Sequence, residues 1–217
     1  MHRLWPSVVA VIGVGLFGVL RLNDLPTEMV THWNLQGAAD GTSSRAWGVF
    51  LLPGVALATA LLLAVVPRID PLRRNFDQHA DAYWLLANTV VVFLAFLHLA
   101  VLGSNLGWPV PMGQAIGCGA GALLLVLGNY LSRIRQNWFL GIRTPWTLSS
   151  EKSWRETHRL GGKLFVAGGL LLIVTTLLTA TLPMWALIVG VGAPSLALVV
   201  YSYVIWSRDP AAQGRTQ

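Results

Sequence analysis

Long apolar runs separated by short polar segments dominate the hydrophobic pattern of this chain. A helix needs roughly 20 apolar residues to cross a bilayer. Six runs meet that length, at 4–21, 48–66, 83–102, 112–131, 164–182 and 184–206. No small-residue cleavage site follows the first run, so we expect it to be a retained helix and not a signal peptide. The pattern predicts an all-α, polytopic membrane protein built as a bundle of six transmembrane helices.

The composition supports this class. Of the 217 residues, 54% are hydrophobic and 11% are charged, and the mean hydropathy is +0.60. A soluble domain carries about twice that charged fraction. The single cysteine, Cys118, excludes a disulfide framework and a cysteine-based metal site. We predict no cofactor and no metal.

The distribution of Lys and Arg predicts the orientation. If six helices span the membrane, 13 of these residues fall on one side and 2, Arg21 and Arg45, on the other. Cytoplasmic loops carry the excess of basic residues. Both termini are therefore predicted to be cytoplasmic. The net charge of +6 is interpreted as an orientation signal, with no direct binding of nucleic acid.

The polar segments divide the chain into two regions. The first, 1–66, is a two-helix unit with an extracytoplasmic loop at 22–47. The second, 67–217, holds four helices and a basic cytoplasmic loop at 132–163. Glycines inside the helices are expected to allow close helix packing. His98 lies deep in the third run and is expected to be packed and hydrogen-bonded. No carboxylate or basic residue lies inside a run, which argues against a small transporter.

The outer loop carries the first set of candidate binding residues: His32, Trp33, Asn34, Gly37, Asp40 and Gly41. Glu28 and His32 would share one face if this segment were helical. With Asp40 they have ligand types that bind divalent ions, although the spacing matches no known metal motif. The alternative is that His32 and Asn34 hydrogen-bond the loop into a compact cap, with a turn at Asp40–Gly41.

Several residues of this loop resemble a small domain of unknown function found at the N-terminus of many bacterial membrane proteins. The resemblance rests on the motifs Leu25–Pro26, His32–Trp33–Asn34, Gly37 and Asp40–Gly41. The chain departs from that pattern at Met29–Val30, where the domain often has Ile-Pro. This resemblance covers the loop and its flanking helices.

The inner loop is basic and rich in tryptophan. Gly141 and Pro145 break regular structure, so 136–147 is predicted to be an ordered turn. Ser149 or Ser150 is predicted to cap the N-terminus of a helix. Glu151 in its first turn would stabilise this helix, because a negative charge there interacts favourably with the helix dipole. That helix, 150–162, has the basic amphipathic pattern of an interfacial helix running into the fifth span. Its charges would anchor it to anionic membrane lipids.

Three segments of the chain resemble the SdpI-like bacterial immunity proteins: 128–130, 136–148 and 154–162. The resemblance implies a six-helix protein of the bacterial inner membrane that gives resistance to a secreted, membrane-active toxin peptide. In the founding system the protein also signals, by holding a small repressor at the membrane. The inner-loop residues that carry the motif, as an anchor or partner surface, are Gln136, Asn137, Trp138, Gly141, Arg143, Thr144, Pro145, Trp146, Trp154, His158 and Arg159.

We therefore expect a non-enzymatic immunity and signalling protein with no catalytic residue. A toxin peptide would meet the outer face, and a repressor would bind the cytoplasmic face. Two alternatives stay open. One is a membrane enzyme or lipid-handling protein that uses Glu28, His32 and Asp40 outside the membrane. The other is a small transporter.

Overall fold

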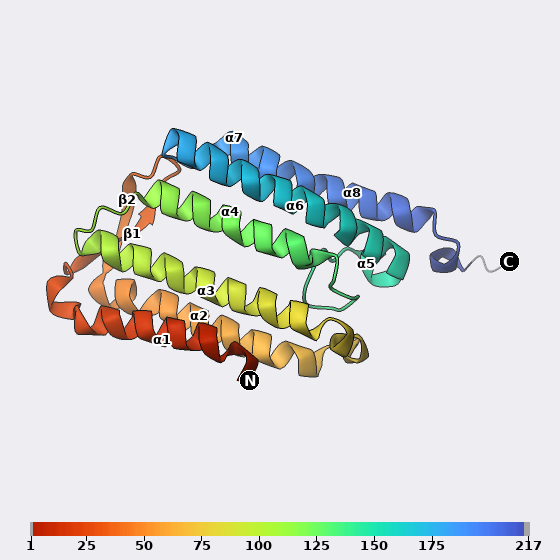
Figure 1. Ribbon diagram of the computed structural model, residues 1–217, viewed down its shortest axis with the longest axis horizontal. Helices are drawn as coiled ribbons and strands as arrows, with labels where there is room; N and C mark the ends of the chain where they lie inside the picture. The colour runs from red at the N-terminus through yellow and green to blue at the C-terminus, as the bar shows by residue number, and fades with distance from the viewer. Residues whose placement is uncertain (1, 215–217) are drawn as a thin grey trace.

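The computed structural model describes residues 2–214, except for the side chains of His2 and Gln213. The helices run side by side along the long axis of the molecule (Figure 1). Their bounds are α1 Trp5–Leu20, α2 Arg45–Ile69, α3 Ala80–Asn105, α4 Met112–Leu131, α5 Pro145–Ser149, α6 Glu151–Thr179, α7 Met184–Leu187 and α8 Ala193–Ser207. Strands β1 Glu28–Trp33 and β2 Ala39–Ser44 pair at one end of the bundle, and α5 lies at the other. The protein is an all-α, polytopic membrane protein.

Five helices are long and apolar enough to cross a membrane: α2, α3, α4, α6 and the combined helix Met184–Ser207. The sixth apolar helix, α1, has 16 residues and is shorter than a typical span. It nevertheless packs against α2 and α3 in one apolar cluster that includes Val11, Ala56 and Val91. Arg3, just ahead of α1, contacts Asp81 at the start of α3, with 2.8 Å between Nη1 and Oδ1. Of the six predicted spans, five are therefore helices long enough to cross a membrane, and the first, α1, is shorter.

Glycine forms the contact between α4 and α6, as the sequence predicts. A Cβ atom on Gly128 would lie 2.7 Å from the carbonyl oxygen of Gly162, and one on Gly162 would lie 2.7 Å from that of Gly128. Gly121 of α4 and Gly169 of α6 face each other in the same way at a second point of contact between the two helices. Small residues let two backbones approach closely in lipid, where van der Waals packing holds helices together.

The last span is irregular where Pro194 occurs. A π-helical turn, Ile188–Gly192, separates α7 from α8, and the proline falls in the first turn of α8. Proline has no backbone N–H to donate to the preceding turn, so the hydrogen-bond ladder must rearrange there. Gly190 within this turn packs directly on Gly168 of α6. The irregularity in this span is therefore the π-turn that precedes the proline.

Three local expectations need correction. The outer loop is a β-hairpin, so the premise of a helical face shared by Glu28 and His32 is wrong. The helix expected at 150–162 is the first part of the continuous helix α6, and Trp154 and His158 on it are buried in the protein. His98 is 1% exposed as expected, but its ring nitrogens have no hydrogen-bond partner among the described residues.

Candidate functional site

The hairpin lies across one end of the bundle with one side packed and the other exposed. Met29 is completely buried and would collide with any side chain at Gly48, so β1 rests directly on the start of α2. Trp33 is half-buried against the apolar cluster that includes Leu25 and Val49. Trp33 therefore helps to hold the hairpin, while Glu28, His32 and Asp40 remain exposed.

A side chain from α3 clamps the hairpin along its free edge. Asn105 accepts a hydrogen bond from the backbone N–H of Val30 at 2.8 Å and donates one to the Val30 carbonyl at 2.9 Å. These are the two bonds that a neighbouring strand would make. Asn105 thus acts as a substitute for a third strand. Sequence reasoning missed it because an asparagine at a helix end gives no sign of a partner 75 positions away.

We expect Asn105→Ala to free the hairpin from the bundle while leaving its own turn intact. The substitution removes two hydrogen bonds and leaves the Val30 backbone unpaired, at a cost of about 2 kcal/mol. Hydrogen–deuterium exchange of a peptide covering 28–33, followed by mass spectrometry, measures the effect. The exposed Asn23→Ala is the control and should leave the exchange unchanged. Equal protection in both variants would contradict the clamp.

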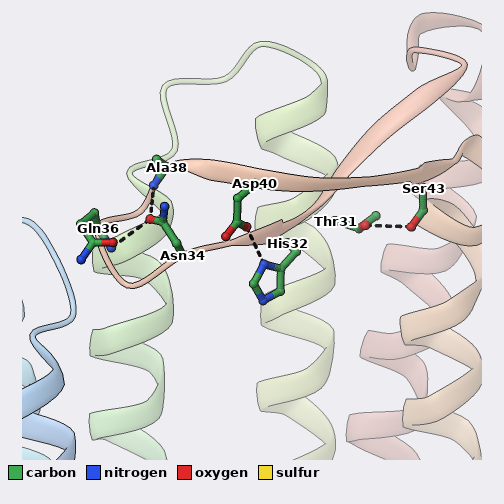
Figure 2. A network of polar contacts seen from close by, with 7 residues as sticks. All are labelled: Thr31, His32, Asn34, Gln36, Ala38, Asp40 and Ser43. Carbon is green, nitrogen blue, oxygen red and sulfur yellow. Dashed lines mark hydrogen bonds and ion pairs between the residues drawn. The ribbon is translucent and has the colours of Figure 1, made fainter.

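The tip of the hairpin is built by Asn34 and Gly37. The Asn34 side-chain oxygen accepts hydrogen bonds from the backbone N–H groups of Gln36 and Ala38, each at 3.0 Å (Figure 2). Gly37 adopts φ 78°, which glycine allows without strain. Its Cα lies close to Gly113 at the start of α4, where a Cβ would be 3.3 Å from the Gly113 Cα. Asn34 and Gly37 therefore shape and dock the tip, as the compact-cap interpretation expects.

His32 and Asp40 form an exposed pair on the hairpin (Figure 2). His32 Nδ1 lies 2.5 Å from Asp40 Oδ1, and the two side chains are 70% and 42% exposed. The register shifts on both sides of His32, between Val30 and Trp33, as at a β-bulge, which can re-aim side chains. An ionised carboxylate only accepts, so Nδ1 donates and Nε2 stays free for a ligand. Gly41 lies opposite His32, where a Cβ would be 2.9 Å from the histidine Cβ.

The three-residue metal site considered for Glu28, His32 and Asp40 is not formed. Glu28 pairs with Ser44 at the far end of the ladder, while His32 pairs with Gly41 near the tip. Among the described residues, no three His, Cys, Asp or Glu side chains are placed to hold a metal ion. The hairpin brings together His32 and Asp40 only.

At the opposite end, the basic loop is folded by its own polar side chains. Asn137 accepts from the backbone N–H groups of Phe139 and Leu140 and donates to the carbonyl groups of Arg135 and Leu140. Gln136 donates to the carbonyl groups of Thr147 and Leu148. The predicted ordered turn is confirmed for 136–144, but Pro145 does not break regular structure: it begins the short helix α5. These motif residues face inward, so their first role is to shape the loop.

His158 joins this loop to α6. Its Nε2 accepts a hydrogen bond from the backbone N–H of Ile142 at 3.0 Å, and its Nδ1 lies 2.8 Å from the carbonyl oxygen of Trp154. These partners require a proton on Nδ1 and a lone pair on Nε2. The imidazole also stacks on the Trp154 indole, with ring centroids 4.0 Å apart. Gly141, at φ 117°, leaves the space that His158 fills.

The end of the chain is tied to the same loop. Thr144 caps α5 and contacts Ser202 of α8, with 3.0 Å between the two hydroxyl oxygens. Ser150 caps α6, as predicted, and donates to Asp209 at 2.6 Å. Ser202 and Asp209 carry no motif signal, because each matters only through a partner more than 50 positions away. The segment between α2 and α3 contributes Asp70, which accepts a hydrogen bond from the backbone N–H of Trp138 at 3.0 Å.

His79 lies beside Asp70 at the start of α3. Its burial lowers the pKa of the imidazole below the usual value of 6.5, and this outweighs the opposing effects of the backbone at Asn75 and of the Asp70 carboxylate. His79 is therefore neutral at pH 7. Its low folded-state pKa lets the unfolded chain bind more protons as the pH falls below 6.5, which disfavours the folded state there.

The remaining motif residues lie at the surface of the basic end. Trp138, Arg143, Pro145 and Arg159 are exposed, and Trp146 is half-buried against Tyr203. Arg143 donates from Nη1 to the carbonyl group of Trp138 at 2.8 Å, and Arg159 pairs with Glu156 at 2.9 Å. The motif thus divides into buried residues that build the loop and exposed residues that remain accessible.

Comparison with known proteins agrees with the motifs at both ends. The SdpI/YfhL protein family matches residues 133–202, and a domain of unknown function (DUF1648) matches residues 8–57. The chain is also 28% identical to the Immunity protein SdpI of Bacillus subtilis (strain 168) over 194 residues, which cover 89% of each protein. The chain is therefore similar to SdpI over most of its length. No solved structure matches it.

The SdpI match covers the region in which the buried polar contacts concentrate. Within 133–202 lie the Asn137 turn, the His158–Trp154 stack, the Thr144 cap and its partner Ser202. The match to the domain of unknown function covers the whole hairpin, with α1 and the first part of α2. The two matched regions therefore include the two polar ends of the bundle, the hairpin in one and the basic loop in the other. The similarity supports a membrane immunity protein in bacteria and points away from an enzyme.

Proposed function

We propose that this SdpI-like protein protects a bacterial cell against a membrane-active toxin peptide. The observation that carries the proposal is the similarity to an immunity protein over 89% of both chains. This length includes the hairpin end, the bundle and the basic end together. A binding protein also fits the described residues better than an enzyme with a three-ligand metal site, because Glu28 lies away from His32 and Asp40.

In the proposed orientation, the basic end and both termini face the cytoplasm of the bacterial cell, with the protein in the inner membrane. The split of 13 basic residues against 2 supports this orientation. The contact between Arg3 and Asp81 and that between Ser150 and Asp209 bring both ends of the described chain to the basic end of the bundle. The hairpin would then face outward, where a secreted peptide arrives first.

The proposed ligand surface is the exposed side of the hairpin. His32 and Asp40 would contact the peptide directly, since both side chains are exposed and the histidine keeps one ring nitrogen free. Asn34, Gly37, Gly41 and the half-buried Trp33 would present this pair by fixing the tip and register of the hairpin.

On the cytoplasmic side, the exposed motif residues Trp138, Arg143 and Arg159 would form the surface for a repressor protein. These residues belong to the segment that matches the family, and the loop beneath them is fixed by hydrogen bonds from Gln136 and to His158. A rigid basic and aromatic surface is suited to binding a protein partner, because aromatic and arginine side chains dominate such interfaces.

The test is survival of cells exposed to a panel of secreted, membrane-active peptides, with and without the gene. For at least one peptide, the wild-type gene should raise the lethal concentration severalfold. His32→Ala and Asp40→Ala should each remove most of that protection, while Glu28→Gln on the same hairpin retains it. Protein levels in the membrane must be equal for all variants. Equal survival with and without the gene across the panel would refute the immunity function.

A further inference from the structure

A polar cavity of about 260 Å³ lies at the basic end of the bundle. Three segments far apart in the sequence meet there: the 3-10 helix Arg73–Gln78, the turn after α4 and the first turns of α6. Each segment supplies one arginine, namely Arg74, Arg135 and Arg155. The buried indole of Trp154 also lines the cavity.

The walls of this cavity are fixed by hydrogen bonds that leave the arginines free. Asn75 donates to the carbonyl group of Gln136 at 2.9 Å, which joins the 3-10 helix to the turn after α4. Trp154 donates from Nε1 to the carbonyl group of Ile134 at 2.8 Å, which joins α6 to the same turn. The amide groups of Asn75 and Gln136 are therefore committed to the frame. The guanidinium groups remain as its charged donors, beside the uncharged side chains of Gln78 and Ser132.

The positive charge of the cavity is poorly balanced. The guanidinium groups of Arg74 and Arg135 have no ion pair or hydrogen bond within residues 2–214, and that of Arg155 has only a long contact of 3.8 Å with Glu156. Glu151 is the single carboxylate in the lining. The three arginines are exposed, and like charges at the edge of one small space favour an anion between them.

We propose that this cavity binds a phosphate group. Arginine presents a planar fork of donors that matches phosphate oxygens, and a tetrahedral phosphate offers several oxygens to forks arriving from different directions. The cavity is smaller than the roughly 300–1,000 Å³ of pockets for drug-sized ligands, which suits a small anionic group. The phosphate comes from a phospholipid headgroup at the membrane surface or from a soluble phosphate compound. This inference is independent of the immunity function.

The chain supplies a matched control for the position of the charges. Arg73 adjoins Arg74 in the 3-10 helix, and Arg133 lies two positions before Arg135, yet neither lines the cavity. Arg133 instead stacks over the Tyr130 ring. The double variants Arg74→Gln/Arg135→Gln and Arg73→Gln/Arg133→Gln change the net charge equally, but only the first removes charges that line the cavity.

The experiment measures binding of two probes to the full-length protein in an uncharged detergent: inorganic phosphate and a short-chain phosphatidylglycerol. We expect at least one probe to bind, and Arg74→Gln/Arg135→Gln to weaken binding about tenfold or more. Arg73→Gln/Arg133→Gln should bind as the wild type does. Glu151→Gln should tighten binding severalfold, because it removes the repelling carboxylate.

The two probes distinguish the source of the phosphate. Binding of phosphatidylglycerol without inorganic phosphate identifies a lipid headgroup, and binding of both identifies the phosphate group itself as the recognised element. Equal weakening by the two double variants would overturn the cavity site, since it would mean that overall charge alone attracts the anion. If neither probe bound to folded wild-type protein, the proposal would also be overturned. Size-exclusion chromatography confirms that each variant is folded.

Discussion

Replacing Gly128 with alanine is expected to lower the stability of the folded bundle by about 1–3 kcal/mol, the usual cost of overpacking. The added methyl group would lie 2.7 Å from the Gly162 carbonyl oxygen and 2.8 Å from the Val166 backbone nitrogen. Both are backbone atoms of α6, so no side chain can turn away to make room. The two helices must separate, which weakens packing along their whole contact. Thermal unfolding in detergent, followed by size-exclusion chromatography, measures the loss.

Gly13→Ala is the matched control, with the opposite expected sign. No atom lies within 4 Å of a Cβ placed on Gly13. Alanine favours a helix over glycine by up to about 1 kcal/mol, so this variant should unfold at the wild-type temperature or above it. If Gly128→Ala were as stable as Gly13→Ala, the close contact between α4 and α6 would be wrong.

Replacing His158 with phenylalanine is expected to loosen the basic loop. Phenylalanine keeps a flat ring for stacking on Trp154 but removes the acceptor for the Ile142 N–H at 3.0 Å. An unpaired backbone donor in this partly buried site costs about 1–3 kcal/mol. Tryptic cleavage after Arg143 should accelerate roughly tenfold, because cleavage follows the population of the opened loop. Mass spectrometry of the cleavage products measures that rate.

The control for this variant is Arg159→Gln, the neighbouring exposed residue, whose contact is a surface ion pair with Glu156. Exposed pairs of this kind contribute little, so cleavage after Arg143 should keep its wild-type rate. An unchanged rate in His158→Phe would show that the loop does not depend on the hydrogen bond to Ile142.

The spans were predictable because a bilayer imposes a length and an apolar composition that a single sequence displays directly. The glycines of α4 and α6 were predictable for the same reason, since close packing in lipid needs small residues. The hairpin was not predicted. Its strands have six residues each, and β2 reads Ala-Asp-Gly-Thr-Ser-Ser, which has no apolar alternation. Its stability comes from Asn105 and Met29, that is, from tertiary contacts.

The candidate site was predictable as a set of residues but not as an arrangement. The motifs singled out Asn137, Thr144, Trp154 and His158, yet nothing in their spacing shows that these side chains are buried. The direction is set by partners elsewhere in the chain, such as Asp70 for the Trp138 backbone and Asp209 for Ser150. Each partner is a single polar residue in an ordinary loop, without a pattern of its own.

The hairpin touches more than the helices beside it in sequence. The Leu35 carbonyl group at its tip accepts a hydrogen bond from the Leu182 backbone at 3.1 Å, just beyond the end of α6. The other end of α6 carries Trp154 and His158, which hold the basic loop. Between them runs one unbroken helix of 29 residues, about 43 Å long. A stiff rod of this kind cannot tilt at one end alone. If the proposed ligand shifted the hairpin tip, this helix would carry the displacement to the basic loop at the opposite end of the bundle.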